Sequence, residues 1–290
     1  MSGLLDGGES CGFCIFNNVA AGALYAISDE RLLCDKCAIV DIDVHHGNGT
    51  EEIVRKCQDP SKLFFFSIHL YDNNKKSKNP NSYKFYPGTG AEDDLAMNII
   101  NVPIVPLWKD PAPTAPKTHY TRQKRKPDTT STNDEESSET PRESPRDWPS
   151  DGSVSSTTPH PPSLSSGRLA YRQAIQSRLL PSLRAFNPDL ILISAGFDAA
   201  KGDVGNARHE RDRERMGLDL EAEDYAWATR KILEVADLCC QGRVVSVLEG
   251  GYGRTASGTQ LDRSFLAECA IRHLQAMIDP YDTERRFQGS

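Results

Sequence analysis

Two carboxylates and an imidazole alternate along the segment Asp41-Ile-Asp43-Val-His45. In an extended strand successive side chains point to opposite faces, so these three polar side chains share one face while Ile42 and Val44 take the other. Such donors at a strand end can form half of a metal site. A strand that simply runs into a polar turn is the plainer reading of this segment alone.

Two further apolar runs also end in residues that can do chemistry. The run before Ser194 continues into Asp198, and the run before Leu248 continues into a Gly-rich turn that carries Tyr252. Together Asp43, His45 and Asp198 would supply three N/O ligands and leave a fourth position open, which is the pattern of catalytic zinc. Two carboxylates would also balance the charge of the dication.

The elements that must position these residues alternate between strands and helices. The sequence predicts strands over 37–43, 63–68, 98–102, 189–194 and 243–248, and helices over 17–30, 50–57, 168–186, 221–240 and 261–278. Pro103 should stop the third strand, and Pro181 should kink the third helix. Apolar strands alternating with helices indicate an α/β fold with a mainly parallel sheet covered on both faces. In such sheets ligands bind beyond the carboxyl ends of the strands, where the polar residues above lie.

One long segment has a different composition. Of the 57 residues from Pro111 to Gly167, 30 are Pro, Ser or Thr. Such a segment buries too little apolar surface to offset the entropy of ordering it. We therefore expect one domain formed by residues 1–110 and 168–290, interrupted by a disordered insertion over 111–167.

The overall composition excludes some classes of partner and indicates where in the cell the protein is found. A net charge of −7 argues against a partner that is nucleic acid, and the chain has no apolar run long enough to span a membrane. The segment 1–10 is acidic and lacks the features of a signal peptide. The eight cysteines are then expected to be reduced thiols. The predicted location is the nucleus, the cytoplasm or both.

Two alternative sites deserve a test. Cys11-x-x-Cys14 and Cys34-x-x-Cys37 have the spacing of a four-cysteine zinc site, although an apolar helix lies between the pairs. The segment 251–256 matches the G-x-G-x-x-A pattern of dinucleotide-binding proteins but opens no immediate helix.

Five segments, in this order, resemble the zinc-dependent histone deacetylases, with a class II-like character. They are Gly12–Val19 (GFCIFNNV), Asp41–Gly49 (DIDVHHGNG), Phe85–Gly90 (FYPGTG), Ser194–Ala199 (SAGFDA) and Leu248–Tyr252 (LEGGY). The resemblance implies a three-layer α/β/α fold of the arginase/deacetylase type and hydrolysis of N-acetyl-lysine. It implies acetylated histone tails or other acetyl-lysine proteins as partners, with corepressor subunits, in chromatin regulation and transcription repression.

The resemblance also implies a role for particular residues. The zinc ligands fall on Asp43, His45 and Asp198, and Tyr252 matches the tyrosine that donates a hydrogen bond to the acetyl carbonyl. The residues matching the substrate tunnel are Phe13, Tyr86, Gly250 and Gly251. Those matching a potassium site beneath the zinc are Asp41, Ser67 and Ile68, with the backbone near the zinc ligands.

One part of the family pattern has no match. The catalytic tandem histidine of a Pro-Gly-His-His segment should precede Gly12, yet none of the first eleven residues is His. We therefore expect a chain truncated at its N-terminus that lacks the first strands of the family's sheet. Such a chain should be poorly soluble and nearly inactive. The alternatives are a non-catalytic deacetylase-fold scaffold or acyl-lysine-binding protein, and an amidohydrolase acting on a small acetylated amine.

Overall fold

The computed structural model describes residues 2–5, 9–13, 15–72, 85–109, 164–210, 213–256 and 260–281, with the backbone alone at 2–5, 9–13, 209–210 and 213–214. The chain divides into two units, one formed by residues 1–110 and 164–290 and the other by residues 111–163. Nearly all of the predicted insertion, from Pro111 to Ser163, lies outside the described residues. The fold below is that of the first unit.

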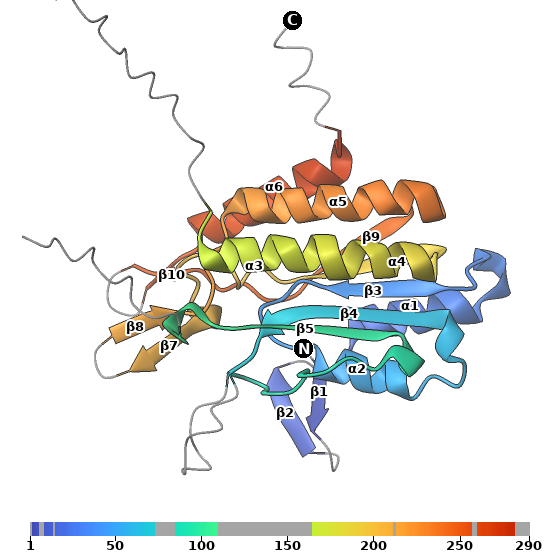
Figure 1. Cartoon of the computed structure of the whole chain (residues 1–290), viewed down its shortest axis with the longest axis horizontal. Coiled ribbons are helices and arrows are strands. Elements are labelled where there is room, and N and C mark those ends of the chain that lie inside the picture. Colours follow the sequence, from blue (N-terminus) through green and yellow to red (C-terminus); the bar gives the residue numbers. More distant parts are fainter. Residues whose placement is uncertain are drawn as a thin grey trace, which may run out of the picture. The chain divides into compact units, whose positions relative to one another are not determined.

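Five parallel strands form the central sheet of this unit. In their spatial order they are β5 (Ile99–Ile104), β4 (Leu63–Leu70), β3 (Cys37–Asp41), β6 (Leu190–Ala195) and β9 (Val244–Leu248) (Figure 1). All five were predicted from their apolar runs, but β3 ends at Asp41 and not at the predicted Asp43, so Asp43 and His45 lie in the bend after the strand. The carboxyl ends of β3, β4 and β6 are level, because Asp41 is in register with Ser67 on one side and with Ser194 on the other. Polar residues that follow these strands are therefore brought together.

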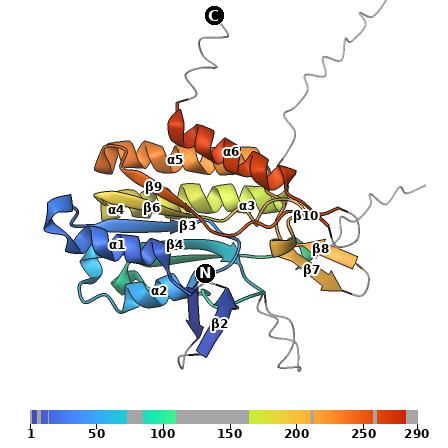
Figure 2. The same cartoon turned by 180° about the vertical axis from the view of Figure 1, so that it is seen from behind.

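Helices cover both faces of the sheet. They are α1 (Asn18–Ser28), α2 (Asn48–Arg55), α3 (Ser166–Ala174), α4 (Leu180–Phe186), α5 (Ala222–Cys240) and α6 (Ser264–Ile278). The first two lie on one face and the other four on the opposite face (Figures 1 and 2). No helix among the described residues is long and apolar enough to cross a membrane.

The strand side chains separate into two apolar cores. Val40 and Phe66 pack on the side of α3–α6, whereas their neighbours Ile39 and Phe65 pack on the side of α1 and α2. This alternation follows from the two-residue repeat of a strand that is buried on both faces. The three-layer α/β/α architecture expected from the sequence is thus confirmed.

The predicted helix over 168–186 is interrupted. It begins earlier, at Ser166, after Ser165 as N-cap, and it contains a π-helical turn over Ile175–Leu179 between α3 and α4. Pro181 lies in the first turn of α4 and has no N–H to donate to the preceding turn, so a local change of helical register accommodates it. Ser166 and Gly167 therefore belong to the domain and not to the insertion.

The predicted end of the third strand at Val102 is wrong. Strand β5 continues through Pro103 to Ile104. The strand pairs only with β4 in the sheet, so the missing N–H of Pro103 faces an edge that needs no donor. Three short hairpins were also not predicted, β1 (Ser2–Leu5) with β2 (Glu9–Phe13), β7 (Ala207–Glu210) with β8 (Arg213–Met216), and β10 (Arg254–Thr255) with β11 (Leu261–Asp262).

A buried histidine ties the last helix to the sheet. His273 of α6 is 1% exposed, and its two ring nitrogens lie 2.7 Å from Thr229 Oγ1 on α5 and 2.8 Å from Ser246 Oγ on β9. Burial lowers the pKa of His273 to about 4. The folded protein thus holds this imidazole neutral at pH values where the unfolded chain protonates it.

We expect this histidine to make the domain less stable in mild acid. Because the pKa is lower in the folded state, the unfolded state binds more protons as the pH falls from about 6.5 to about 4, and the free energy of unfolding should drop by roughly 3 kcal/mol over that range. Urea unfolding between pH 7 and pH 4 measures the drop. His273→Gln should flatten the pH dependence by about one proton, and an unchanged slope in this variant would contradict the assignment.

Candidate metal centre

The three sequence-predicted ligands meet at the carboxyl ends of β3 and β6. His45 Nδ1 lies 3.0 Å from Asp43 Oδ1 and 3.0 Å from Asp198 Oδ2. Possible ligand atoms of the three residues all lie within 4.8 Å of one another. In the part of the chain that the structure describes, no other set of three His, Cys, Asp or Glu side chains comes this close. Cys34 and Cys37 join no such group, while Cys11 and Cys14 have no described side chains.

The charges of this cluster suit a cation. Both carboxylates are buried. Burial alone would lower the pKa of His45, but the charge of Asp198 and hydrogen bonds to both carboxylates raise it to about 10. Burial and the charge of Asp43 raise the pKa of Asp198 to about 6. The two carboxylates therefore call for positive charge between them, which a zinc ion would supply with the ligand types that it prefers.

Backbone groups orient the two carboxylates. The Val44 N–H donates to Asp198 Oδ1 at 2.9 Å, and the Gly250 N–H donates to Asp43 Oδ2 at 3.1 Å. The other oxygen of each carboxylate is the one that faces His45. The two ligands are thus held from the far side, and the turn after β9 contributes to a site whose ligands follow β3 and β6.

Glycines make room for the carboxylates. A Cβ at Gly250 would come closer than 3.0 Å to carboxylate oxygens of both Asp43 and Asp198, and a Cβ at Gly196 would meet Asp43 in the same way. Real Cβ atoms essentially never make such contacts. The space that a larger residue would fill is therefore kept for the ligand side chains.

Gly250→Ala should disturb the metal site without a backbone penalty, because Gly250 is not among the residues with positive φ. We expect roughly a 10–100-fold loss of zinc affinity, as the added methyl group displaces the two carboxylates. Titration with a competing zinc chelator measures it. Gly22→Ala in α1 is the matched control, since its Cβ would meet only Leu192 at an ordinary 3.7 Å. Unchanged zinc affinity in Gly250→Ala would show that the carboxylates do not need this space.

Tyr252 lies beside the ligand cluster. A Cβ at Gly205 would be 2.8 Å from Asp198 Cβ and 2.9 Å from Tyr252 Cδ2, so the phenol ring and the ligand flank the same point. Tyr252 is 36% exposed. It follows Gly251, whose φ of 121° is a conformation that glycine adopts readily and other residues do not. The short strand β10 follows this turn instead of a helix, so the turn lacks the helix that a dinucleotide-binding site requires.

Aromatic rings line the other side of His45. Phe85 stacks on its imidazole with ring centroids 4.9 Å apart, and Tyr86 meets it edge-on at 6.2 Å. Tyr86 was predicted from the sequence as part of the site, whereas Phe85 was not. The predicted partner Phe13 lies in β2, and its side chain is outside the described residues.

A hydrogen-bonded network of polar side chains beside the site, buried at His46 and Asn101, was not predicted. The ring nitrogens of His46 lie 2.7 Å from Thr89 Oγ1 and 2.8 Å from Glu51 Oε2, and Asn101 Nδ2 also donates to Glu51. Burial alone would raise the pKa of Glu51, but hydrogen bonds to His46, Asn101 and Arg55 lower it to about 2. These hydrogen bonds link the loop that contains His45 to the loop that contains Tyr86. The His-His pair together with an acid in the first turn of the next helix is the signal that could have shown it.

The residues of the predicted potassium site follow neighbouring strands. Asp41 and Ser67 are in register on β3 and β4, and Ile68 is the next residue of β4. Asp41 is buried and accepts from the Asp43 N–H at 3.0 Å. Burial and the charge of Asp43 raise its pKa well above the usual range. The Ser67 hydroxyl lies 2.9 Å from His69 Nδ1.

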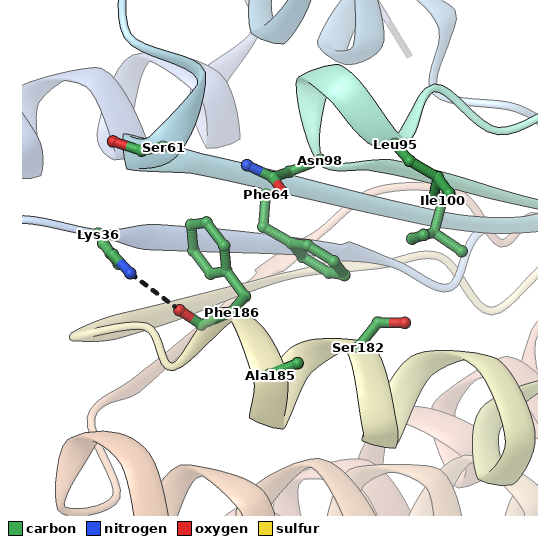
Figure 3. A pocket seen from close by; sticks show the side chains of 9 residues that line it. All are labelled: Lys36, Ser61, Phe64, Leu95, Asn98, Ile100, Ser182, Ala185 and Phe186. Atoms are coloured by element: carbon green, nitrogen blue, oxygen red, sulfur yellow. Dashed lines mark hydrogen bonds between the residues drawn. The ribbon is translucent and has the colours of Figure 1, made fainter.

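A hollow of about 410 Å³ lies at the opposite end of the sheet from the metal centre, where β4 and β5 begin. Phe64 and Phe186 form much of its wall, and Lys36 donates to the Phe186 carbonyl at 3.3 Å (Figure 3). None of the metal-ligating residues lines it. This hollow is therefore separate from the candidate metal centre at the carboxyl ends of the strands.

The chain is similar to known proteins over most of its length. A family profile described as "Histone deacetylase domain" matches residues 6–267. Type-2 histone deacetylase 2 of Dictyostelium discoideum is 30% identical over 283 residues, which cover 95% of this chain and 12% of that protein. Histone deacetylase 15 of Arabidopsis thaliana is 29% identical over 281 residues, which cover 94% of this chain and 35% of that protein. The chain thus spans a minor part of these relatives.

Solved structures show the same fold. The crystal structure of the HDA15 HD domain superposes with a TM-score of 0.55 at 23% identity, covering 94% of this chain and 52% of the other. The histone deacetylase Clr3 gives a TM-score of 0.54 at 22% identity, covering 93% of this chain and 32% of the other.

Proposed function

Because this chain belongs to the histone deacetylase family, we propose that its metal centre serves zinc-dependent hydrolysis of N-acetyl-lysine on histones or other proteins. The observation that carries the proposal is the Asp43, His45 and Asp198 cluster with the Tyr252 ring beside it. A metal with three N/O ligands and an open position is the arrangement of catalytic zinc sites.

The side chains around the centre divide the work. Asp43, His45 and Asp198 would hold Zn²⁺, which when bound supplies Lewis-acid polarisation of a carbonyl and of water. The phenolic O–H of Tyr252 would donate a hydrogen bond to the acyl oxygen. A hydrogen bond of this type is worth roughly 3–4 kcal/mol in the transition state. The Tyr86 ring, with Gly250 and Gly251 across the site and Phe13 by resemblance, would enclose the lysine stem. Asp41, Ser67 and Ile68 would hold K⁺ beneath the zinc ligands.

The general acid and base have no counterpart in the described site. His46, His69 and His273 each have both ring nitrogens within hydrogen-bonding distance of other protein groups. Burial and the charge of His46 also lower the pKa of His69 to about 3. We infer that residues 1–290 bind zinc and acyl-lysine but turn over slowly, because the tandem histidine of the family pattern is missing. A non-catalytic scaffold is the alternative.

The setting of this activity is part of the proposal. We propose one deacetylase domain from residues 1–110 and 168–290, extended to Ser166 by the start of α3 and interrupted by the insertion predicted from the sequence. Its partners would be acetylated histone tails or other acetyl-lysine proteins, together with corepressor subunits, in the nucleus or cytoplasm. This chromatin role would make the protein a regulator of transcription repression.

The test combines zinc content, peptide binding and turnover on one preparation. The zinc-loaded chain should bind an N-acetyl-lysine peptide and release acetate slowly. Tyr252→Phe should keep its zinc and lose roughly 10²–10³-fold of that release, because it removes only the phenolic donor. Peptide binding without any release of acetate would favour the scaffold, and failure to bind zinc or peptide would refute the proposed function.

A further inference from the structure

We propose that Asp203 is a positioning residue that fixes Tyr252 beside the Asp198 ligand. The proposal deepens the function proposed above, since it concerns the phenol that this function requires. The juxtaposition that carries it is a buried carboxylate between the loop after β6, which contains Asp198, and the turn after β9, which contains Tyr252.

The carboxylate of Asp203 accepts three backbone hydrogen bonds. Its Oδ2 accepts from the Tyr252 N–H at 2.9 Å and from the Gly253 N–H at 2.7 Å, and its Oδ1 accepts from the Gly205 N–H at 2.8 Å. Asp203 is 2% exposed, so these bonds do not compete with bulk water. One side chain thus clasps the backbone of Tyr252 on one side and the loop of Asp198 on the other.

The two segments are joined at further points. The Val204 N–H donates to the Gly253 carbonyl at 3.0 Å, and Arg254 Nε donates to the Lys201 carbonyl at 2.7 Å. The guanidinium of Arg254 also lies 3.6 Å from the centre of the Phe265 ring. Movement of the Tyr252 turn away from the Asp198 loop would break both of these hydrogen bonds together with those of Asp203.

The loop that contains Asp198 is held together by hydrogen bonds of Asn206, which lies in the same loop. Asn206 Nδ2 donates to the Asp198 carbonyl at 2.7 Å and to the Ala200 carbonyl at 2.9 Å. Asn206 Oδ1 accepts from the Gly217 and Leu218 N–H groups. Because Asn206 is buried and Asp203 lies in the same loop, the position of Asp203 is defined relative to Asp198.

The Tyr252 ring lies over this loop at Gly205. Gly205 offers no side chain, and its would-be Cβ lies within about 3 Å of both the ring and Asp198. The ring therefore rests on Gly205 when the backbone of Tyr252 is held by Asp203. The clasp and the glycine together set where the phenol points.

A carboxylate is required by the number of donors. Two N–H groups approach Oδ2 and a third approaches Oδ1, so each of the two oxygens must accept. An amide has one accepting oxygen and one donating nitrogen, so Asp203→Asn must place its NH₂ against at least one N–H. This variant keeps the size of the side chain and breaks the clasp on one side.

The test observes the phenol itself, so that it does not depend on activity. With 3-fluorotyrosine in place of tyrosine, the ¹⁹F resonance of Tyr252 is assigned from its loss in Tyr252→Phe. In the zinc-loaded protein, Asp203→Asn should shift or broaden this resonance and leave the other tyrosines unchanged, with zinc content retained. Lys201→Ala, a substitution in the same loop that keeps its carbonyl, should leave the resonance in place. An unmoved Tyr252 resonance in Asp203→Asn would overturn the proposal.

Two further measurements guard against misfolding of the variant. In the unsubstituted protein the Tyr252 and Gly253 amides should exchange with deuterium at least tenfold more slowly than free loop amides, and exchange at the free rate would refute the clasp. Where turnover is measurable, Asp203→Asn should lower kcat at least tenfold with Tyr252 present and less than twofold with Tyr252→Phe. An equal loss in both backgrounds would show a merely structural role. Absence of turnover with a shifted resonance would count against the proposed function and support the clasp.

Discussion

Replacing Asp198 with alanine should empty the metal centre. The purified protein is expected to hold about one zinc per chain, and Asp198→Ala to hold none after dialysis, because two of three ligands remain and the balancing carboxylate is lost. Elemental analysis of both proteins measures the zinc content. Acetyl-lysine turnover, if present in the parent, should disappear with the metal.

The control for this experiment separates the two possible zinc sites. A chain with Cys11→Ser and Cys34→Ser should keep its zinc, since Cys34 belongs to no metal-like cluster in the described residues. Thermal unfolding of the metal-free proteins shows whether Asp198→Ala is still folded. If the cysteine variant loses the metal while Asp198→Ala retains it, the four-cysteine interpretation is correct and the centre described above is not.

Supplying a tandem histidine should raise turnover by about 10²–10⁴-fold, the usual contribution of general acid–base catalysis. The comparison is between residues 1–290 and the same chain preceded by the Pro-Gly-His-His segment of a longer relative. Both are assayed on an acetyl-lysine peptide at equal zinc content. We expect slow release of acetate from the first protein and rapid release from the second.

The second protein should also be more soluble. Strand β9 pairs only with β6 in the sheet, and Val245 and Leu248 on it are 48% and 69% exposed. An open, apolar strand edge favours aggregation, and strands added beside it would cover it.

Rapid turnover by residues 1–290, abolished by Asp198→Ala, would show that another residue supplies the base. Equal turnover by the two proteins would contradict the assigned role of the histidine pair.

Local patterns in the sequence were enough to predict the strands of the central sheet and the residues of the candidate metal centre. Apolar runs such as 63–68 and 189–194 are strands because they are buried on both faces, and this burial is visible as continuous hydrophobicity. Asp43 and His45 are two residues apart in the bend that follows β3, so their short spacing along the chain brings them together, although the strand itself ends at Asp41. Asp198 follows from the rule that carboxyl ends of parallel strands meet at one edge.

Predictions from local sequence patterns were wrong where the position of a residue in the fold changed the effect of the pattern. Pro103 was read as a strand terminator, but it lies on an edge strand where its missing donor is harmless. The helix predicted over 168–186 has a π-helical turn before Pro181 in place of the predicted kink, because a change of helical register accommodates the proline. Short hairpins such as β7 with β8 have few apolar residues and left no periodic signal.

The sequence by itself determined the layers of this fold, the order of its strands along the chain and the three residues of the candidate metal centre, because these depend on residue types at strand ends and in apolar runs. Only the tertiary structure decided which side chains hold them in place. Asp203 and Gly205 contact Tyr252 from about fifty residues away, and Gly250 faces Asp43 from more than two hundred. Such contacts depend on how loops from separate strands pack against each other, and no spacing along the chain encodes that packing.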